Sequence, residues 1–305
     1  MKILLTGSTG QVGHALLGAL EHYAHTEVVA PVRAQLDLSD AQAIRNYVRT
    51  LQPDLIINPA AYTAVDLAEQ QPELAHAVNA QAPAVLAQEA KALGIGMIHY
   101  STDYVFDGAK RGADGSLQPY TELDAPHPVN VYGATKLAGE QAIVASGCDH
   151  IILRTSWVYS TFGKNFLKTM LRLAQERDEL RVVNDQWGAP TWAGWIAQAS
   201  AAILEQLSGA ADRSAWWAAH RGIYHLTGQG CTSWHGFAQE IVRQAAAAGT
   251  LGKPAPQVTG VTTAEYPTPA RRPVNSCLDT SHFARSFGVT VPPWQAGLDA
   301  CMRAG

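Results

Sequence analysis

The chain is poor in charge of either sign and has no long apolar run. Charged residues make up 16% of its 305 residues, and the net charge of −4 comes with no basic block. This composition argues against nucleic acid or an anionic membrane as a partner. No apolar run approaches the roughly 20 residues that cross a bilayer. A strand-like segment, 2–5, begins almost at once without a basic leader, so we expect no signal peptide and a cytoplasmic protein.

Cysteine is equally scarce, and the histidines show no metal-ligand spacing. No C-x-x-C pair occurs, so we expect reduced, partly buried thiols at all four cysteines: Cys148, Cys231, Cys277 and Cys301. The eleven histidines include no H-E-x-x-H pattern. We interpret His99, inside an apolar run, as a core histidine rather than a metal ligand.

Strand-like and helix-like segments alternate through the first half of the chain. This alternation predicts βαβ units and an α/β fold with a doubly wound parallel Rossmann sheet. Strands are expected at 2–6, 27–30, 35–38, 54–58, 96–106 and 150–159, and Ser39 is expected to cap the helix that ends at Leu51. Helices are expected at 79–93 and from Tyr132 onward.

The pattern loosens after Tyr159, which predicts a smaller C-terminal substrate-binding lobe. Helices are expected at 165–177, 191–207 and 233–248, strands at 180–184 and 222–227, and short helices near Ser281 and Trp294. We predict a NAD(P)-binding domain over 1–160, completed by about 180–210, and a lobe formed mainly by 161–305. Ligands of open α/β folds bind at the carboxyl ends of the strands, so the lobe is expected to cover that edge.

A glycine motif follows the first strand and opens the first helix. Gly7 permits a tight turn, Gly10 lets the backbone approach a pyrophosphate, and Gly13 lets the helix pack close to the strand. The free N–H groups of the helix then face the phosphates. This motif predicts a dinucleotide site that includes Gln11 and Val12.

The spacing G-x-x-G-x-x-G resembles that of short-chain dehydrogenases/reductases. The second strand ends in Pro31-Val32-Arg33 without an acidic residue, so Arg33 either pairs with the 2′-phosphate of NADP or is a solvated loop charge. We expect NADPH, with NADH as the alternative. The resemblance implies further cofactor contacts from Asp37, Leu38, Ala60, Ala61, Tyr62 and Asn79.

Tyr132 and Lys136 lie one helical turn apart on the same face. An ammonium beside a phenol favours the phenolate, which predicts a lowered pKa for Tyr132. Thr102, at the end of a strand, offers a hydroxyl to a substrate carbonyl. Together the three match the Ser/Thr–Tyr–Lys set of the superfamily, with Tyr132 as proton donor and Lys136 also holding the cofactor ribose.

Longer motifs narrow the resemblance. The chain is similar to dTDP-4-dehydrorhamnose reductases over nearly its whole length, in five segments: 101–107, 130–136, 154–159, 184–191 and 267–273. That family implies reduction of the C4 ketone of dTDP-4-dehydro-β-L-rhamnose by NADPH or NADH. It also implies substrate contacts from Thr102, Asp103, Tyr104, Trp157, Asn165 and Arg271.

Some of these roles have structural alternatives. Trp157 is either a pocket residue or a core aromatic of a strand. Arg271 and Arg272 either bind a diphosphate, which favours guanidinium pairing, or are surface loop charges.

The chain departs from the family in three places. Where some relatives bind Mg²⁺ through acidic side chains at a dimer contact, it has Ala15 and Gly194, which cannot ligate a hard cation. We therefore predict no metal and a monomer or weak homodimer. The loop at 107–129 is long, and 209–221 resembles an insertion whose Trp216-Trp217 pair is expected to be a local hydrophobic anchor.

Two other functions fit the same fold. A nucleotide-sugar dehydratase or epimerase is one, but a dehydratase has Asp-Glu after the threonine, and here Tyr104 follows Asp103. A non-catalytic NADP-binding subunit, like the beta subunit of methionine adenosyltransferase, is the other. Intact Thr102, Tyr132 and Lys136 argue against it, because fold alone does not separate these functions.

Overall fold

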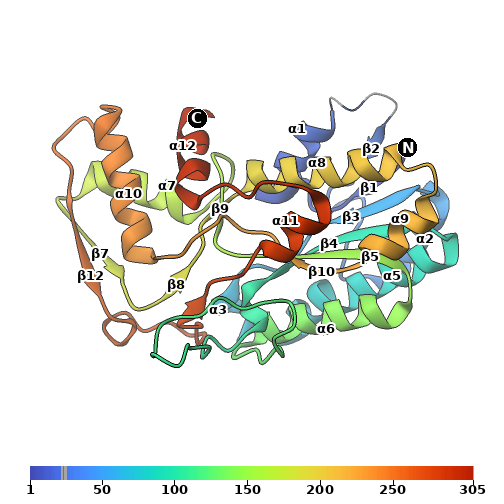
Figure 1. The fold of residues 1–305 in the computed structure, drawn as a ribbon, viewed down its shortest axis with the longest axis horizontal. Coiled ribbons are helices and arrows are strands. Elements are labelled where there is room, and N and C mark those ends of the chain that lie inside the picture. Colours follow the sequence, from blue (N-terminus) through green and yellow to red (C-terminus); the bar gives the residue numbers. More distant parts are fainter. Residues whose placement is uncertain (22, 24–25, 305) are drawn as a thin grey trace.

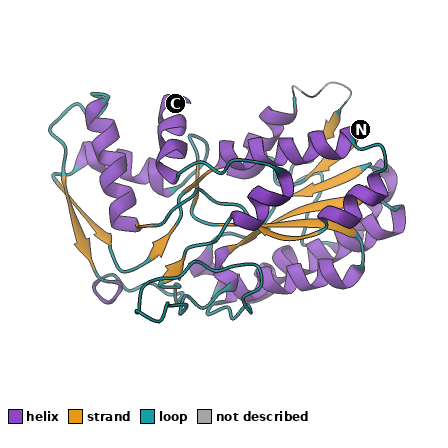
Figure 2. Ribbon diagram, in the orientation of Figure 1, coloured by secondary structure: helices purple, strands orange, loops and turns teal. Residues whose placement is uncertain are grey.

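A computed structural model describes residues 1–21, 23 and 26–304, and its centre is a parallel sheet of six strands. The strand order is β10-β5-β4-β3-β1-β2, and every pairing is parallel. Figure 2 shows the strands between two layers of helix. The doubly wound α/β prediction is confirmed. The strands are β1 (Lys2–Leu5), β2 (Glu27–Val29), β3 (Leu55–Asn58), β4 (Gly96–Thr102), β5 (Asp149–Thr155) and β10 (Gly222–His225).

Alternate side chains of each strand enter different cores. In β1, Ile3 and Leu5 pack on one side and Leu4 on the other, as the two-residue period of a strand requires. One face is covered by α1 (Gln11–Leu20), α8 (Ala193–Gly209), α9 (Arg213–His220) and α11 (Ser281–Phe287), and the other by α2 (Ala41–Leu51), α5 (Ala82–Leu93) and α6 (Val131–Ser146) (Figure 1).

The segment 209–221 is a local anchor, as predicted. It contains α9, whose Trp217 is buried in the core between the sheet and α8. Trp217 lies directly against Gly96, where a side chain on residue 96 would collide with the indole. The anchor therefore depends on a glycine at the start of β4.

Short helices connect β3 to α5 and follow β4. They are α3 (Val65–Ala68), α4 (Pro72–His76), a π-helical turn at Ala77–Gln81 and a 3₁₀ turn at Asp103–Val105. Asn79 begins no helix of its own; it lies in the π turn that runs into α5, whose end is capped by Gly94 as predicted.

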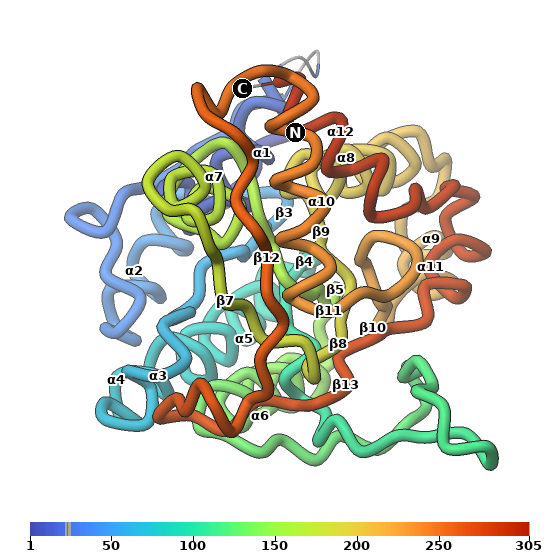
Figure 3. Tube along the Cα trace, turned by 90° about the vertical axis from the view of Figure 1, so that its left-hand side faces the viewer, coloured from blue at the N-terminus to red at the C-terminus, as the bar shows by residue number. Residues whose placement is uncertain are grey.

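The remaining elements form a lobe at the carboxyl edge of the sheet, at the left of Figure 1 and nearest the viewer in Figure 3. Its core lies between α7, α10 and α12 and includes Tyr159, Phe237 and Leu298. The elements are β6 (Val158–Tyr159), α7 (Phe166–Glu176), β7 (Glu179–Val183), β8 (Trp187–Gly188), β9 (Thr191–Trp192), β11 (Thr232–Ser233), α10 (Trp234–Ala247), β12 (Gln257–Val261), a 3₁₀ turn (Thr263–Glu265), β13 (Asn275–Ser276) and α12 (Trp294–Ala304).

Four local predictions are wrong. Residues 35–38 form no strand, since turns lie at 33–35 and 38–39, and Asp40 caps α2 in place of Ser39 by accepting the N–H groups of Gln42 and Ala43 at 2.9 and 3.0 Å. The strand predicted to reach Phe106 ends at Thr102. The strand predicted over 150–159 is broken after Thr155, where Trp157 has a φ of 46° and β6 leaves the main sheet to pair with β9.

The cysteine prediction is also wrong for one pair. Cys231 and Cys277 form a disulfide with Cα atoms 5.9 Å apart, whereas Cys148 and Cys301 are buried free thiols. Both bonded cysteines flank short strands, β11 and β13, that pair with opposite edges of β8. Residues 46 apart in sequence thus become neighbours through a strand pairing that has no local sequence signal.

Candidate active site

A cavity of about 540 Å³ lies at the carboxyl edge of the sheet, from the glycine turn to the start of α6. It includes nearly every residue predicted to bind the cofactor. Those that line it are Gly7, Gly10, Gln11, Val12, Gly13, Arg33, Asp37, Leu38, Ala60, Ala61, Tyr62, Tyr132 and Lys136. The sequence prediction thus describes one continuous surface.

The glycine turn has the compactness that a dinucleotide cradle requires. Gly7 has a φ of 61°, and a Cβ there would lie 2.7 Å from the Ala60 Cα on the neighbouring strand end. A Cβ at Gly13 would collide with the carbonyl of Gly7. The N-terminus of α1 therefore opens directly into the cavity, where its free N–H groups suit a diphosphate. The residues present fit a nicotinamide dinucleotide.

Arg33 and Asp37 occupy the far end of this surface. The Arg33 guanidinium is 76% exposed and lies 3.5 Å from the Asp37 carboxylate. The Ser39 backbone N–H and hydroxyl, followed by Arg33, hold the pKa of Asp37 below its usual value. Arg33 is therefore a cation at the cavity wall, held only by a weak surface pair.

Asn79 does not line the cavity. Its side chain is buried, accepts the Tyr62 N–H at 2.8 Å, and donates to the Tyr62 carbonyl and to Thr135 Oγ1 at 3.1 and 3.2 Å. Asn79 thus fixes the segment that carries Tyr62 against α6. Asn79 was predicted to contact the cofactor, but in this structure it lies behind Tyr62, which lines the cavity.

The start of α6 positions the reacting side chains. Asn130 caps the helix by accepting the Gly133 N–H at 2.8 Å, and its amide donates to the Arg271 carbonyl, also at 2.8 Å. Tyr132 falls in the first turn and Lys136 in the second, and both line the cavity. One cap thus joins α6, which carries Tyr132 and Lys136, to the loop that carries Arg271.

The prediction of a lowered pKa for Tyr132 is wrong for this structure. Burial raises the pKa of Tyr132 to about 12, opposed by a hydrogen bond with the Thr102 hydroxyl and assisted by the charge of Asp103. The Nζ atom of Lys136 is instead held by β4: it donates to the Tyr100 carbonyl at 2.6 Å and lies 3.1 Å from His99 Nε2. Tyr132 is therefore a protonated phenol at neutral pH.

Lys136 is buried without a carboxylate partner of its own. Burial lowers the pKa of Lys136 to about 8, and the nearby Glu140 partly opposes this. Glu140 is already bound by Arg154, whose Nε and Nη2 donate at 2.9 and 2.6 Å. His99 is confirmed as a buried core histidine, and its ring nitrogens face Lys136 and Asn58.

Thr102, Asp103 and Tyr104 lie together beside the phenol of Tyr132. The Thr102 hydroxyl accepts the Tyr104 N–H at 3.2 Å and donates to Asp103 Oδ1 at 3.0 Å. The Tyr104 and Tyr132 rings pack edge to face, with their centroids 5.6 Å apart. Burial raises the pKa of Asp103 to about 6, opposed by hydrogen bonds from hydroxyls that include Ser276 and Thr102.

Trp157 lies outside the cavity lining. Its indole stacks on Trp234 with ring centroids 3.6 Å apart and packs against Gly188, where a Cβ would come within 2.6 Å of the ring. The left-handed backbone of Trp157 directs the ring into this aromatic stack of the lobe. Trp157 thus packs within the lobe, and its substrate contact stays a prediction.

Asn165 forms structural hydrogen bonds in this fold, and its substrate contact stays a prediction. Its Oδ1 caps α7 by accepting the Lys168 N–H at 3.0 Å, while its Nδ2 donates to Gln11 Oε1 at 2.8 Å and to the Ser160 carbonyl at 2.7 Å. The neighbouring Gly163 and Lys164 line the cavity and were not predicted. The sequence signal that could have indicated Lys164 was its position as a basic residue directly before the N-cap asparagine.

The two loop arginines differ. Arg271 is exposed, whereas Arg272 forms an ion pair with Asp66 at 2.8 Å and interacts electrostatically with Tyr104. Arg272 also donates to Thr268 and to the Ala270 carbonyl. The sequence singled out Arg271, but the guanidinium fixed beside Tyr104 belongs to Arg272.

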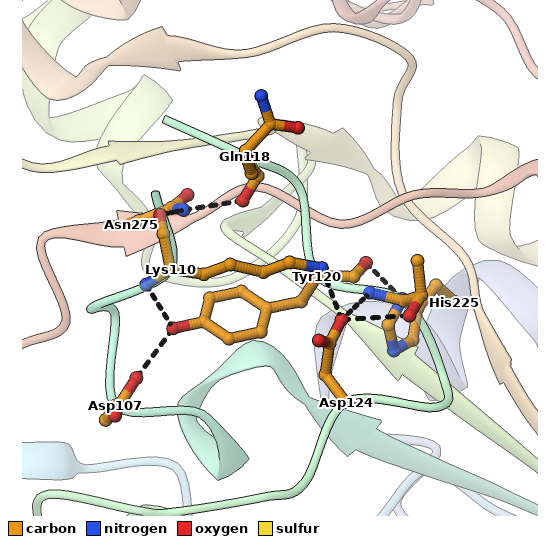
Figure 4. A network of polar contacts seen from close by, with 8 residues as sticks. Asp107, Lys110, Gln118, Tyr120, Asp124, His225 and Asn275 are labelled. Atoms are coloured by element: carbon orange, nitrogen blue, oxygen red, sulfur yellow. Dashed lines mark hydrogen bonds and ion pairs between the residues drawn. The ribbon is translucent and has the colours of Figure 1, made fainter. Parts of the chain in front are cut away.

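The long loop at 107–129 is anchored at several points (Figure 4). The buried Tyr120 donates to Asp107 Oδ1 at 2.6 Å and accepts the Lys110 N–H at 3.0 Å. The Lys110 ammonium pairs with Asp124 at 2.6 Å, and Asn275 of β13 donates to the carbonyls of Lys110 and Gln118. These contacts hold the loop in place between the sheet and β13.

Within the described ranges, no three or more His, Cys, Asp or Glu side chains are grouped to hold a metal ion. None of the described helices is long and apolar enough to cross a membrane.

Comparison with known proteins identifies the family of this chain. The family model described as the RmlD substrate binding domain matches residues 1–305. A dTDP-4-dehydrorhamnose reductase of Burkholderia thailandensis is 44% identical over 304 residues, which are 99% of this chain and 98% of the relative. Among solved structures, the dTDP-4-dehydrorhamnose reductase of Clostridium acetobutylicum has a TM-score of 0.88 at 35% identity, covering 100% of this chain and 99% of the other. That of Bacillus anthracis, in complex with NADP, has a TM-score of 0.85 at 31% identity, with coverage of 100% and 99%.

Proposed function

The chain belongs to the dTDP-4-dehydrorhamnose reductase family, and we propose that it reduces the C4 ketone of dTDP-4-dehydro-β-L-rhamnose with NADPH, giving dTDP-L-rhamnose. The observation that carries the proposal is the cavity shared by the glycine turn, Tyr132 and Lys136, with the Thr102 hydroxyl beside the phenol of Tyr132. These residues suit an oxidoreductase that acts on a nucleotide-sugar ketone.

Each wall of the cavity has a part in holding the cofactor. The glycine turn and the N-terminus of α1 would receive the diphosphate, Asp37 and Leu38 the adenosine, and Arg33 the 2′-phosphate. Lys136 would hold the nicotinamide ribose, with Ala60, Ala61 and Tyr62 alongside. When bound, the cofactor supplies the hydride that adds to the ketone carbon.

Tyr132 then supplies the proton. Its phenol, protonated at neutral pH, gives its proton to the ketone oxygen as the C–O double bond becomes a C–O single bond. The Thr102 hydroxyl beside it orients the same oxygen. Asp103 and Tyr104 complete this surface, and we propose Arg272 as a substrate contact in addition to Arg271, because it is fixed next to Tyr104.

Two other functions are less well supported. A non-catalytic NADP-binding subunit has no need of a Thr102 hydroxyl beside the phenol of Tyr132. An eliminating dehydratase would place a glutamate where Tyr104 stands. Reduction requires only the groups that line this site.

We further propose a two-part organisation and a simple assembly. Residues 1–160 with α8, α9, β10 and α11 form the cofactor domain, and the rest of 161–305 forms the substrate lobe; of the predicted stretch 180–210, α8 packs on the sheet, whereas β7, β8 and β9 pair within the lobe. We expect the enzyme to act in the cytoplasm as a monomer or weak homodimer, which sedimentation at several concentrations would test.

The deciding experiment follows NADPH absorbance when the purified protein meets enzymatically generated dTDP-4-dehydro-6-deoxyglucose, with and without a 3,5-epimerase. Oxidation only with the epimerase is the expected result. Oxidation without it would assign a D-sugar substrate instead. Absence of oxidation in both mixtures, with NADPH still bound, would overturn the reductase proposal in favour of a regulatory subunit.

A further inference from the structure

A buried chain of hydrogen bonds leads from Lys136 through His99 and Asn58 to Thr6. Lys136 Nζ lies 3.1 Å from His99 Nε2, and His99 Nδ1 lies 3.0 Å from Asn58 Nδ2. The Thr6 hydroxyl ends the chain with a 2.5 Å hydrogen bond to Asn58 Oδ1. All four side chains are almost fully buried, and Thr6 again borders the cavity.

His99 is a neutral imidazole between these partners. Burial, and then the charge of Lys136, hold the pKa of His99 well below its usual value. A neutral imidazole has one N–H and one acceptor nitrogen, so the side of His99 that donates must be opposite the side that accepts. An ammonium at Lys136 can only donate, so Nε2 must then be the acceptor, whereas a neutral amine at Lys136 can accept a hydrogen bond from Nε2–H.

Two arrangements satisfy every atom of the chain. With Lys136 as a neutral amine, His99 Nε2–H donates to Nζ, Nδ1 accepts from the Asn58 amide, and Asn58 Oδ1 accepts the Thr6 hydroxyl, which matches the amide orientation in this structure. With Lys136 as an ammonium, Nζ donates to Nε2, and His99 carries its proton on Nδ1. Asn58 must then turn its oxygen toward His99 and its amide toward Thr6, whose hydroxyl can equally accept.

The rest of the Lys136 environment does not fix one charge state. The Tyr100 carbonyl accepts from either an amine or an ammonium. Glu140 is bound by Arg154, and no ion pair that involves Lys136 occurs in the part of the chain that the structure describes. Tyr132, the remaining titratable group at this end of the cavity, is a neutral phenol at ordinary pH. The imidazole is therefore the partner whose hydrogen-bonding changes with the charge of Lys136.

We propose that His99 is a positioning residue whose tautomer switches with the charge of Lys136, so that Lys136 gains or loses a proton without leaving a buried donor or acceptor unpaired. Conversion to the ammonium takes up one proton: the proton on Nε2 passes to Nζ, and a proton from solvent takes its place on Nδ1. This inference rests on the proposed reductase function, because it assigns His99 to the machinery of that reaction. Its physical core, the tautomer switch, does not depend on turnover.

The direct test is histidine ring ¹⁵N NMR of the NADP⁺-bound protein as a function of pH. The His99 signals are assigned from their loss in His99→Asn. Because burial lowers the pKa of Lys136 to about 8, we expect the Nδ1–H form below that pH and the Nε2–H form above it, with the ring neutral throughout. A Lys136→Met variant removes the titrating amine and should hold one tautomer at every pH. One unchanged tautomer in the unaltered protein would overturn the proposal.

Two matched substitutions test the role in turnover. His99→Gln places an amide near the position of Nε2, where it reaches Lys136, whereas His99→Asn places one near Nδ1, where it reaches Asn58 and leaves Lys136 unpaired. We expect His99→Asn to lower kcat by at least about tenfold and to shift the alkaline limb of the pH profile, with NADPH affinity within about twofold. His99→Gln should retain most of kcat.

Equal losses of kcat in both variants, with an unshifted pH profile, would show that His99 acts only in packing. Melting temperatures of both variants distinguish this case from global unfolding. If the unaltered protein showed the tautomer switch yet oxidised no NADPH in the epimerase assay, the proposed function would fail while the switch stood.

Discussion

Asn165 Nδ2 donates to Gln11 Oε1 at 2.8 Å, which joins the N-cap of α7 in the lobe to the first residue of α1 in the glycine turn. Ser160 donates to the same oxygen at 3.0 Å. Nearby, the ring of Phe162 stacks on His14 of α1 at 3.9 Å. The loop that carries Gly163 and Lys164 is thus fastened to the helix whose N-terminus faces the cavity.

This tie predicts separate effects for two substitutions at Asn165. Asn165→Asp keeps an N-cap acceptor but cannot donate to Gln11, so NADPH should bind several-fold more weakly while stability changes little. Asn165→Ala loses both interactions and should also lose about 1 kcal/mol of unfolding free energy. Fluorescence titration with NADPH and urea denaturation measure the two quantities. A raised KM for the sugar with unchanged NADPH binding would instead support direct substrate contact by Asn165.

Tyr132→Phe tests the proton donor. The ring and its packing remain, so we expect NADPH affinity within about threefold of the unaltered enzyme and a loss in kcat of about a hundredfold or more. Single-turnover measurement of NADPH oxidation reports the chemical step. Tyr266→Phe, at an exposed tyrosine on the lobe surface, is the matched control and should leave turnover unchanged. Near-normal kcat in Tyr132→Phe would remove the phenol from the mechanism.

Arg33→Ala tests the preference for NADPH. An exposed guanidinium at the cavity wall pairs with a 2′-phosphate but has nothing to bind on the 2′-hydroxyl of NADH. We therefore expect the KM for NADPH to rise about tenfold and that for NADH to stay within about twofold. Arg172→Ala removes a comparably exposed arginine from α7 and is the control. Equal effects on both cofactors would make Arg33 an unspecific surface charge.

Tyr120→Phe tests whether the 107–129 loop is fixed. Removing the hydroxyl leaves Asp107 and the Lys110 N–H without this partner, which should cost about 1–3 kcal/mol of unfolding free energy at neutral pH. Urea denaturation provides the measurement. A difference within error would mean that the loop contributes little to stability.

The same substitution should show a pH dependence of known sign. The Tyr120 hydroxyl, followed by the Ala109 N–H, holds the pKa of Asp107 below its usual value. A lowered folded-state pKa contributes stability above the unfolded-state value and loses it as the pH falls through the folded-state value. The difference between the two proteins should therefore shrink below about pH 4. A constant difference down to acid pH would assign it to packing.

Much of the site could be predicted because its residues follow from local rules. A turn from a strand into a helix that holds a phosphate requires glycines, and Gly7, Gly10 and Gly13 follow that rule. The four-residue spacing of Tyr132 and Lys136 fixes their common helix face. Residues such as Ala60 and Tyr62 follow the end of a buried strand, and parallel strands end at the same edge. These relationships depend on spacing along the chain, so the sequence contains them.

The sequence by itself determined the α/β alternation, the glycine cradle and the chemical identity of the reacting groups. Only the tertiary structure decided where the partners of those groups lie. It moved Asn79 out of the cavity lining, stacked Trp157 on Trp234, paired Cys231 with Cys277, and placed His99 behind Lys136. Each of these depends on contacts between segments far apart in sequence, where burial and neighbouring charge, rather than spacing, set a side chain's conformation and its pKa. For the same reason Tyr132 stays a protonated phenol despite the lysine one turn away.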